Sequence, residues 1–190
     1  MFSTLTDRLI ASIISIGSLL FPFMENIEPT FRDIKFNTSG NVVVLSLYLD
    51  NWYTEQLNQV ISSGQTIKLF YQLDLLQESG KKPVQTKRFY HTVRYSLLDN
   101  RYEILTSETG RLQYFPDISE VHSHFTTVTN FPVLKSGDLE SGKDYYFRLT
   151  AYLENIAFIG DDSDFNLMFF WNDKNPSVNT EVFNSTIFLY

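Results

Sequence analysis

Hydrophobic and polar residues alternate along the middle of the chain, which is the pattern of a strand with one buried face. The alternation runs through residues 66–76, resumes at 84–98, and continues in the shorter segments 101–107 and 112–115. Clusters of Gly, Pro, Asp and Asn separate these segments, and such clusters form turns. The pattern therefore predicts an antiparallel meander over residues 66–115.

Two further strands and two short helices are expected around the meander. Residues 33–36 and the apolar run VVVLSLYL at 42–49 predict strands. Residues 52–62 carry apolar side chains at helical spacing, with Asp50 and Asn51 as the expected start and Gly64 as the expected stop. A second helix is expected after Asp117, where Glu120 completes a capping box and apolar spacing continues to Val128.

The last third of the chain predicts more strands, at residues 145–153, 165–171 and 182–190. Residues 131–134 and 172–179 are expected to be connections. Short antiparallel strands with few helices favour a fold of two packed sheets. We therefore predict a mainly β chain, folded as an immunoglobulin-like antiparallel β-sandwich of about seven to nine strands with two short inserted helices.

A spacing near the start of the 145–153 segment supports that fold class. Leu139, Gly142 and Tyr145 follow one another in the order seen at the tyrosine corner of immunoglobulin-like domains. No composition shift or repeat divides the chain, so residues 25–190 are predicted to form a single domain.

The N-terminal segment predicts export from a bacterial cytoplasm. Residues 9–23 contain no charge and are too short for an ordinary membrane-spanning helix, so residues 1–24 are expected to be a signal peptide or an N-terminal membrane anchor. The protein would then be periplasmic or extracytoplasmic, either released or held at the inner membrane. The alternative is a buried N-terminal helix of a cytosolic protein.

Composition excludes several classes of function. The formal net charge is −7 and no run of Lys or Arg occurs, which disfavours nucleic acid and an anionic membrane surface as partners. The chain has no Cys, which excludes disulfides and thiol chemistry. Aromatic residues make up 16% of the chain, an enrichment that fits strands.

Motifs of known chemistry are missing from the sequence, so neither a catalytic residue nor a cofactor is predicted. The chain has neither a G-x-S-x-G elbow nor a glycine-rich nucleotide-binding loop. His122 and His124 lie two residues apart on the second expected helix and therefore point to different faces, while His91 is expected to pack within a strand.

Two candidate surfaces remain. Asp161, Asp162 and Asp164 form an acidic loop that offers oxygen ligands to Ca²⁺, although a solvated turn is the commoner role of such a loop. The aromatic run Phe169, Phe170 and Trp171 would place bulky rings on both faces of a strand, either as core or as a patch for a partner.

The order of several segments resembles a bacterial family of small exported proteins known only as a domain of unknown function. The resemblance rests on LSLYLDNWYTEQLNQVISSG, QTIKLFYQLDLLQ and the hairpin FYHTVRYSLLDNRYEIL, and continues through ISEVHSHF, NFPVLKSGDLESGKDYYFRLTAYLE and FNLMFFW. It covers roughly residues 34–190, and departs near the end, where relatives carry more Trp. It implies export, a β-rich domain and gene neighbours that encode sensor histidine kinases, and it transfers no catalytic residue.

These observations favour a non-enzymatic interaction or accessory module of the cell envelope, linked to signalling and bound to an envelope protein. Two alternatives stay open at this point. One is an envelope hydrolase or carbohydrate-active enzyme that uses the loop at residues 155–164. The other is a protein that binds an apolar ligand between its sheets, a function suggested by the 17 Phe residues. The sequence indicates no oligomeric state.

Overall fold

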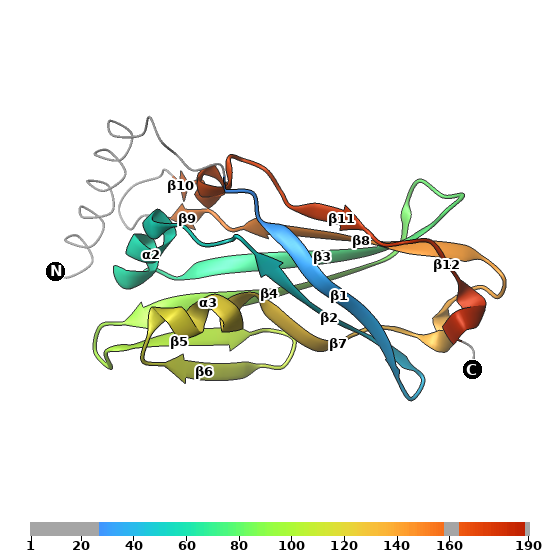
Figure 1. Ribbon diagram of the computed structural model, residues 1–190, viewed down its shortest axis with the longest axis horizontal. Coiled ribbons are helices and arrows are strands. Elements are labelled where there is room, and N and C mark those ends of the chain that lie inside the picture. The colour runs from blue at the N-terminus through green and yellow to red at the C-terminus, as the bar shows by residue number, and fades with distance from the viewer. Residues whose placement is uncertain (1–26, 158–163, 189–190) are drawn as a thin grey trace.

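The computed structural model describes residues 27–157 and 164–188. The chain is mainly β with antiparallel strand pairing, and the described residues contain two α-helices, so the predicted fold class is confirmed at this level. The larger sheet has the strand order β11-β8-β3-β4-β5-β6, with β12 also pairing with β8 (Figure 1). Its strands are β3 (Ile67–Gln77), β4 (Pro83–Ser96), β5 (Arg101–Thr106), β6 (Arg111–Phe115), β8 (Asp144–Leu153), β11 (Ser177–Asn179) and β12 (Phe183–Asn184).

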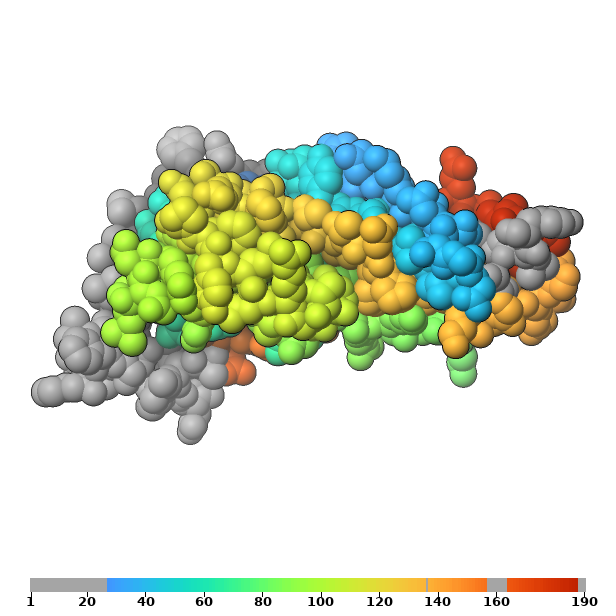
Figure 2. Space-filling view, turned by 90° about the horizontal axis from the view of Figure 1, so that it is seen from below, coloured from blue at the N-terminus to red at the C-terminus, as the bar shows by residue number. Residues whose placement is uncertain are grey.

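A smaller sheet lies across one face of the larger sheet. It contains β1 (Thr30–Ser39), β2 (Val42–Asp50) and β7 (Thr127–Lys135), in the order β1-β2-β7. In Figure 2, the segment that contains β6 and α3 (Ile118–Thr126), the strand β7 and the β1–β2 hairpin follow one another along the molecule. The helix α3 thus covers the part of the larger sheet that the smaller sheet leaves open, and it contacts β4, β5 and β6.

The predicted meander over residues 66–115 is confirmed, because β3, β4, β5 and β6 pair in sequence as antiparallel neighbours. The alternation within β3 follows the prediction. The inward residues of this strand are all at most 3% exposed, and they are Ile67, Leu69, Tyr71, Leu73 and Leu75.

One hydrophobic core joins the two sheets. The rings of Phe36 in β1 and Phe147 in β8 stack with centroids 4.6 Å apart, and those of Phe89 in β4 and Phe131 in β7 lie 4.2 Å apart. Burial of these apolar faces against each other is the main force that holds the layers together. The immunoglobulin-like arrangement of the two sheets stays a prediction.

The helices form where the sequence predicts them, with different ends. The helix α2 (Glu55–Ser62) begins after Thr54, whose Oγ1 accepts a hydrogen bond from the backbone N–H of Leu57 at 3.0 Å. The predicted start at Asp50 and Asn51 is therefore wrong, because Thr54 offers a capping hydroxyl closer to the apolar face. Gly64 follows the helix with a φ of +86°, as its position predicts.

The helix α3 begins as predicted, with the Asp117 carboxylate accepting from the backbone N–H of Ser119 at 2.8 Å. It ends earlier than predicted, at Thr126, and Val128 belongs to β7. Residues 131–134 are likewise part of β7 and not a connection. Pairing of β7 with β2 decides this segment, and such pairing is a long-range contact that local spacing does not record.

The predicted strands at residues 165–171 and 182–190 are wrong for most of their length. The first contains only the end of β10 (Asp164–Phe165), which pairs with β9 (Ile156–Ala157), and then the 3-10 helix η2 (Leu167–Trp171). The second contains β12 and the 3-10 helix η3 (Ser185–Phe188). Short apolar runs fit a strand and a buried helical turn equally well, which explains both errors.

A hydrogen bond joins the start of β8 to the segment that precedes it. The hydroxyl of Tyr145 accepts a hydrogen bond from the backbone N–H of Glu140 at 3.3 Å, and Leu139 is buried. The Ser185 hydroxyl donates to the carbonyl of Glu140 at 2.9 Å, so this corner also holds η3. The 3-10 turn η1 (Ser136–Asp138) leads into it.

The predicted signal peptide or anchor at residues 1–24 lies outside the described residues. Within residues 27–157 and 164–188, the longest helices are too short and too polar to cross a bilayer.

Candidate functional site

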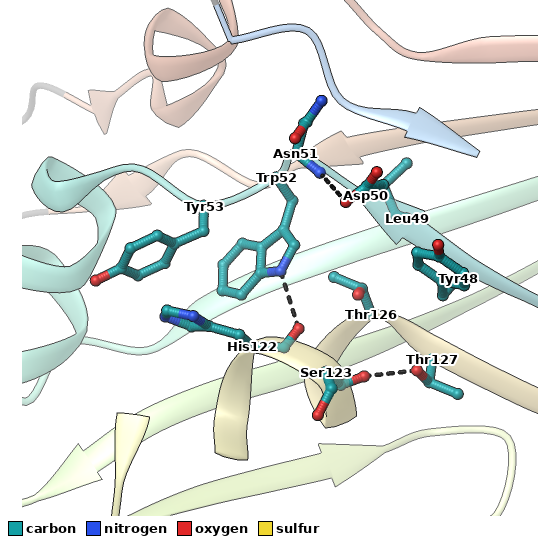
Figure 3. Close-up of a pocket in the computed structure, with 10 residues that line it drawn as sticks. All are labelled: Tyr48, Leu49, Asp50, Asn51, Trp52, Tyr53, His122, Ser123, Thr126 and Thr127. Atoms are coloured by element: carbon teal, nitrogen blue, oxygen red, sulfur yellow. Dashed lines mark hydrogen bonds between the residues drawn. The ribbon is translucent and has the colours of Figure 1, made fainter. Parts of the chain in front are cut away.

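A hollow of about 570 Å³ opens between the end of β2 and the end of α3 (Figure 3). We call it the aromatic groove, and it is lined by Tyr48, Leu49, Asp50, Asn51, Trp52, Tyr53, His122, Ser123, Thr126 and Thr127. Its volume is in the range of about 300–1,000 Å³ that is usual for ligand sites. Two segments about 70 residues apart in the sequence therefore form one site.

The backbone turn at Asn51 shapes one wall of the groove. Asn51 has a φ of +53°, in the left-handed region that Asn tolerates better than most residues. Its backbone N–H donates to the Asp50 carboxylate at 2.9 Å, which ends β2. In Figure 3, the Trp52 side chain points toward α3 while that of Asn51 points away.

Trp52 forms the floor of the groove and is held from two sides. Its indole N–H donates to the carbonyl of His122 at 3.1 Å, and its own carbonyl accepts from the indole N–H of Trp171 at 2.8 Å. The Trp52 ring also packs on Phe125 with centroids 4.9 Å apart, and the residue is only 3% exposed. These contacts fix the floor before any ligand arrives.

His122 and Tyr53 form the wall nearest α2. Their ring centroids lie 3.7 Å apart at an interplanar angle of 46°. Burial lowers the pKa of His122, against a smaller opposing effect of the Asp117 carboxylate, so the neutral imidazole is favoured at neutral pH. Burial, followed by the charge of Glu55, raises the pKa of Tyr53 and keeps its phenol protonated.

The hydroxyls on the rim are engaged by backbone carbonyls. Ser123 donates to the carbonyl of Glu120 at 3.3 Å, and Thr127 donates to the carbonyl of Ser123 at 2.5 Å. The Ser123 hydroxyl also lies 3.3 Å from Nδ1 of His124. That nitrogen is 2.8 Å from the Glu120 carbonyl, which only accepts, so it carries a proton and does not activate Ser123 as a base would.

The structure describes some of the candidate residues that the sequence pointed to. Asp161 and Asp162 lie outside the described residues, and Asp164 is exposed in β10. Of the aromatic run, only Phe169 reaches solvent, at 41% exposure, whereas Phe170 and Trp171 are buried in the core. The three rings thus form no common surface.

The histidines follow the sequence prediction. His122 packs against Tyr53 while His124 packs against Phe115, so the two rings face different elements. His91 is fully buried in β4. Among residues 27–157 and 164–188, no three acidic, His or Cys side chains are grouped as a metal site would require.

The residues of the aromatic groove were not predicted as a site from the sequence. The sequence LYLDNWY carries one usable signal, since aromatic residues flank the Asp-Asn pair that ends a strand. Nothing local in the sequence brings this segment to His122, because the contact depends on the docking of α3.

A second hollow of about 390 Å³ lies at the opposite edge of the two sheets. We call it the Phe36 groove, and it is lined by Ile34, Phe36, Phe147, Thr180, Glu181, Phe183 and Ile187. Its walls come from β1 in the smaller sheet, from β8 in the larger sheet and from residues 180–187, after β11.

Comparison with known proteins places the chain in a family without assigning an activity. A family model described as Domain of unknown function (DUF4390) matches residues 28–157. The chain belongs to this family. No curated protein and no solved structure matches it. The match contains the whole aromatic groove, whereas the lip of the Phe36 groove at residues 180–187 lies beyond it.

Proposed function

We propose that the protein is a non-enzymatic interaction module of the bacterial cell envelope, which binds a partner protein in the aromatic groove. The resemblance to a family encoded beside sensor histidine kinases suggests the extracytoplasmic part of an envelope sensor as that partner. The module would then be accessory to signalling, and an exposed segment of the sensor would occupy the groove.

The fixed position of Trp52 is the observation that carries this proposal. Its indole N–H and its carbonyl are both hydrogen-bonded, to His122 and Trp171, in the free protein. A surface that is ordered in advance loses less conformational entropy on binding. Trp and Tyr are also the residue types that most often dominate the energy of protein interfaces, and Tyr48 and Tyr53 flank the floor.

The exposure of these rings favours a protein partner over a glycan. A sugar stacks on an open aromatic face, which the Trp52 ring, at 3% exposure, does not offer; a protein segment would contact the half-buried Tyr48 and Tyr53 rings that Trp52 supports. An apolar centre within a polar rim, here Asp50, Asn51 and Ser123, is the usual arrangement of a protein interface. The rim hydroxyls donate to carbonyls, an arrangement that suits binding better than nucleophilic catalysis.

Photocrosslinking in the native host tests the proposal. A benzophenone amino acid at Ser123, an exposed residue of the groove rim, is compared with the same group at Lys81, in the β3–β4 loop at the other end of the molecule (Figure 1). We expect a discrete adduct with one envelope protein from position 123 and none from position 81.

Two tyrosine variants give the matched control. Tyr53 and Tyr146 are both partly buried, but only Tyr53 lines the groove. Tyr53→Ala should reduce the yield of the adduct strongly, and Tyr146→Ala should leave it unchanged at equal circular dichroism. An adduct that persists in Tyr53→Ala, or forms equally from position 81, would contradict the proposal.

The envelope location is a separate part of the proposal, and it is supported by the uncharged run at residues 9–23. Membrane contact would then be made only through residues 1–24. Fractionation of native cells, followed by determination of the N-terminal residue, tests it. A mature chain that starts near Glu25, or an uncut chain in the membrane fraction, is expected. An intact Met1 in the cytosol would refute export.

The hydrolase alternative depends on the acidic residues near position 160. Replacement of Asp161, Asp162 and Asp164 together by Ala should leave a deletion phenotype fully complemented if the protein is not an enzyme of this kind. Failure of that variant to complement, at normal protein level, would favour the alternative.

We also propose that the two sheets form an immunoglobulin-like sandwich. Their shared core and the Tyr145 contact with Glu140 support this arrangement. An experimental structure that places the strands in another topology would overturn it.

A further inference from the structure

The Phe36 groove lies where the edges of the two sheets meet. One lip is β1, from the smaller sheet, and the other is the segment that follows β11 and contains β12 and η3. In Figure 1, β1 and this C-terminal segment lie near the same end of the molecule, away from α2. The Phe36 groove is thus separate from the aromatic groove, and its function does not depend on the one proposed there.

Stacked aromatic rings line the groove without interruption. Phe36 and Phe147 are almost parallel, with an interplanar angle of 9° and centroids 4.6 Å apart. Phe183 continues the stack, 5.5 Å from Phe147. Ile34 and Ile187 extend the apolar wall at the lips. Such a wall binds hydrocarbon by excluding water from both surfaces.

The polar atoms at the groove are satisfied within the protein. The Thr180 hydroxyl accepts from the backbone N–H of Phe147 at 2.9 Å and donates to the carbonyl of Glu181 at 3.0 Å. The backbone N–H of Thr180 donates to the carbonyl of Phe147 at 2.9 Å. A ligand in the groove therefore gains by apolar contact and not by hydrogen bonds to Thr180.

The charge at the rim restricts the polar end of such a ligand. Glu181 is exposed and is the one ionisable residue among those that line the groove. Its carboxylate, in a chain of formal net charge −7, repels an anionic head group. The volume of about 390 Å³ is at the small end of ligand sites, and it suits one chain and not several.

We propose that the Phe36 groove binds a single acyl or alkyl chain of an amphiphile whose head group carries no negative charge. The chain lies between β1 and the C-terminal segment, against Phe36, Phe147 and Phe183. The head group lies at the rim, near Glu181.

Calorimetric titration of the full chain with monomeric alkyl maltosides of increasing chain length tests the proposal. The Kd should fall by about fourfold for each added methylene until the groove is filled. Alkyl sulfates of the same length should bind more weakly than the maltosides. Glu181→Gln should lower the Kd of the alkyl sulfates and leave that of the maltosides unchanged, so the two Kd values should become more similar.

Two variants on the C-terminal segment localise the binding. Ile187 and Val182 are both exposed aliphatic residues, at 57% and 48%, but only Ile187 lines the groove. Ile187→Asp should weaken maltoside binding by about tenfold or more, because it places a charge against the chain, and Val182→Asp should not. Both variants keep residues 1–26, so any binding of maltoside to that segment is the same in the two. A difference in Kd between the two variants therefore reports on the groove alone.

Several outcomes would overturn the proposal. The first is that no binding of any maltoside or sulfate is detected, and the second is a Kd that does not depend on chain length. The third is an equal effect of Ile187→Asp and Val182→Asp on maltoside binding. The fourth is that alkyl sulfates bind the wild-type protein as tightly as the maltosides do. A dimer in sedimentation that Ile187→Asp converts to a monomer, without amphiphile, would assign the groove to a second copy of the chain instead.

Discussion

His91 lies in β4 with its side chain fully buried, and both of its ring nitrogens face hydrogen-bond acceptors. Nδ1 lies 2.7 Å from the carbonyl of Phe125, and Nε2 lies 2.9 Å from a carboxylate oxygen of Glu108. A carbonyl only accepts, so Nδ1 carries a proton. The second contact then requires another proton, either on Nε2 or on the Glu108 carboxyl group. The pair joins β4, the end of α3 and the turn between β5 and β6.

Removal of the imidazole should be costly. His91→Phe keeps a ring but removes both ring nitrogens. The Phe125 carbonyl then loses its donor, Nδ1, and the Glu108 carboxyl group loses its hydrogen bond to Nε2. The Glu108 side chain is only 6% exposed, so water does not replace the lost partner. Loss of one member of a buried pair costs about 3–5 kcal/mol.

Glu108→Gln is the matched substitution, since its amide N–H can donate to Nε2 while Nδ1 keeps its bond to Phe125. We expect this variant to lose less than about 1.5 kcal/mol. The double variant His91→Phe with Glu108→Leu removes both polar partners, and it should recover much of the stability lost in His91→Phe alone.

Urea unfolding followed by tryptophan fluorescence measures these free energies of unfolding. A loss below about 1 kcal/mol in His91→Phe would refute the argument, because it would mean that Glu108 is solvated in the folded protein. Equal losses in His91→Phe and Glu108→Gln would also refute it. Since α3 carries His122, the His91→Phe variant should in addition bind the partner of the aromatic groove more weakly.

Three other substitutions have defined outcomes. Trp171→Phe removes the donor to the Trp52 carbonyl, and it should cost about 1–3 kcal/mol and lower the melting temperature by about 5 °C in calorimetry. Folding lowers the pKa of His122, so the unfolded chain binds a proton there more readily than the folded protein does. The stability linked to His122 is therefore present above about pH 6.5 and is lost as the pH falls through the lower pKa of the folded state. His122→Gln should remove this part of the acid sensitivity, measured by urea unfolding at a series of pH values. Gly64→Ala, at a φ of +86°, should cost about 1–2 kcal/mol in the same assay, whereas Gly137→Ala, with no positive φ and open space around it, should not.

The parts of the fold that the sequence predicted are those in which one face of an element is buried. In β3 each inward residue from Ile67 to Leu75 alternates with a more exposed one over most of the strand, so the period of two is visible in the sequence. The same reasoning located α2 and α3 because their apolar residues repeat at helical spacing. Local patterns suffice wherever water touches one side of the element.

The segment Leu167–Trp171 lacks that asymmetry. Four of its five residues are buried: Leu167, Met168, Phe170 and Trp171. The sequence therefore shows neither the two-residue period of a strand nor the longer period of a helix. The backbone N–H of Leu153 even donates to the Met168 sulfur at 3.1 Å. The conformation is set by the surfaces that enclose the segment, and these come from distant parts of the chain.

The aromatic groove could not be predicted for the same physical reason, and its construction links it to the C-terminal part of the chain. The family match ends at Ala157, yet the donor that holds the Trp52 carbonyl is Trp171. Ile187, farther along, lines the Phe36 groove. Residues 164–188 therefore support the floor of one groove and supply a lip of the other. Because Trp171 is fully buried and donates to the Trp52 carbonyl, a change that displaces η2 should also move the backbone at Trp52.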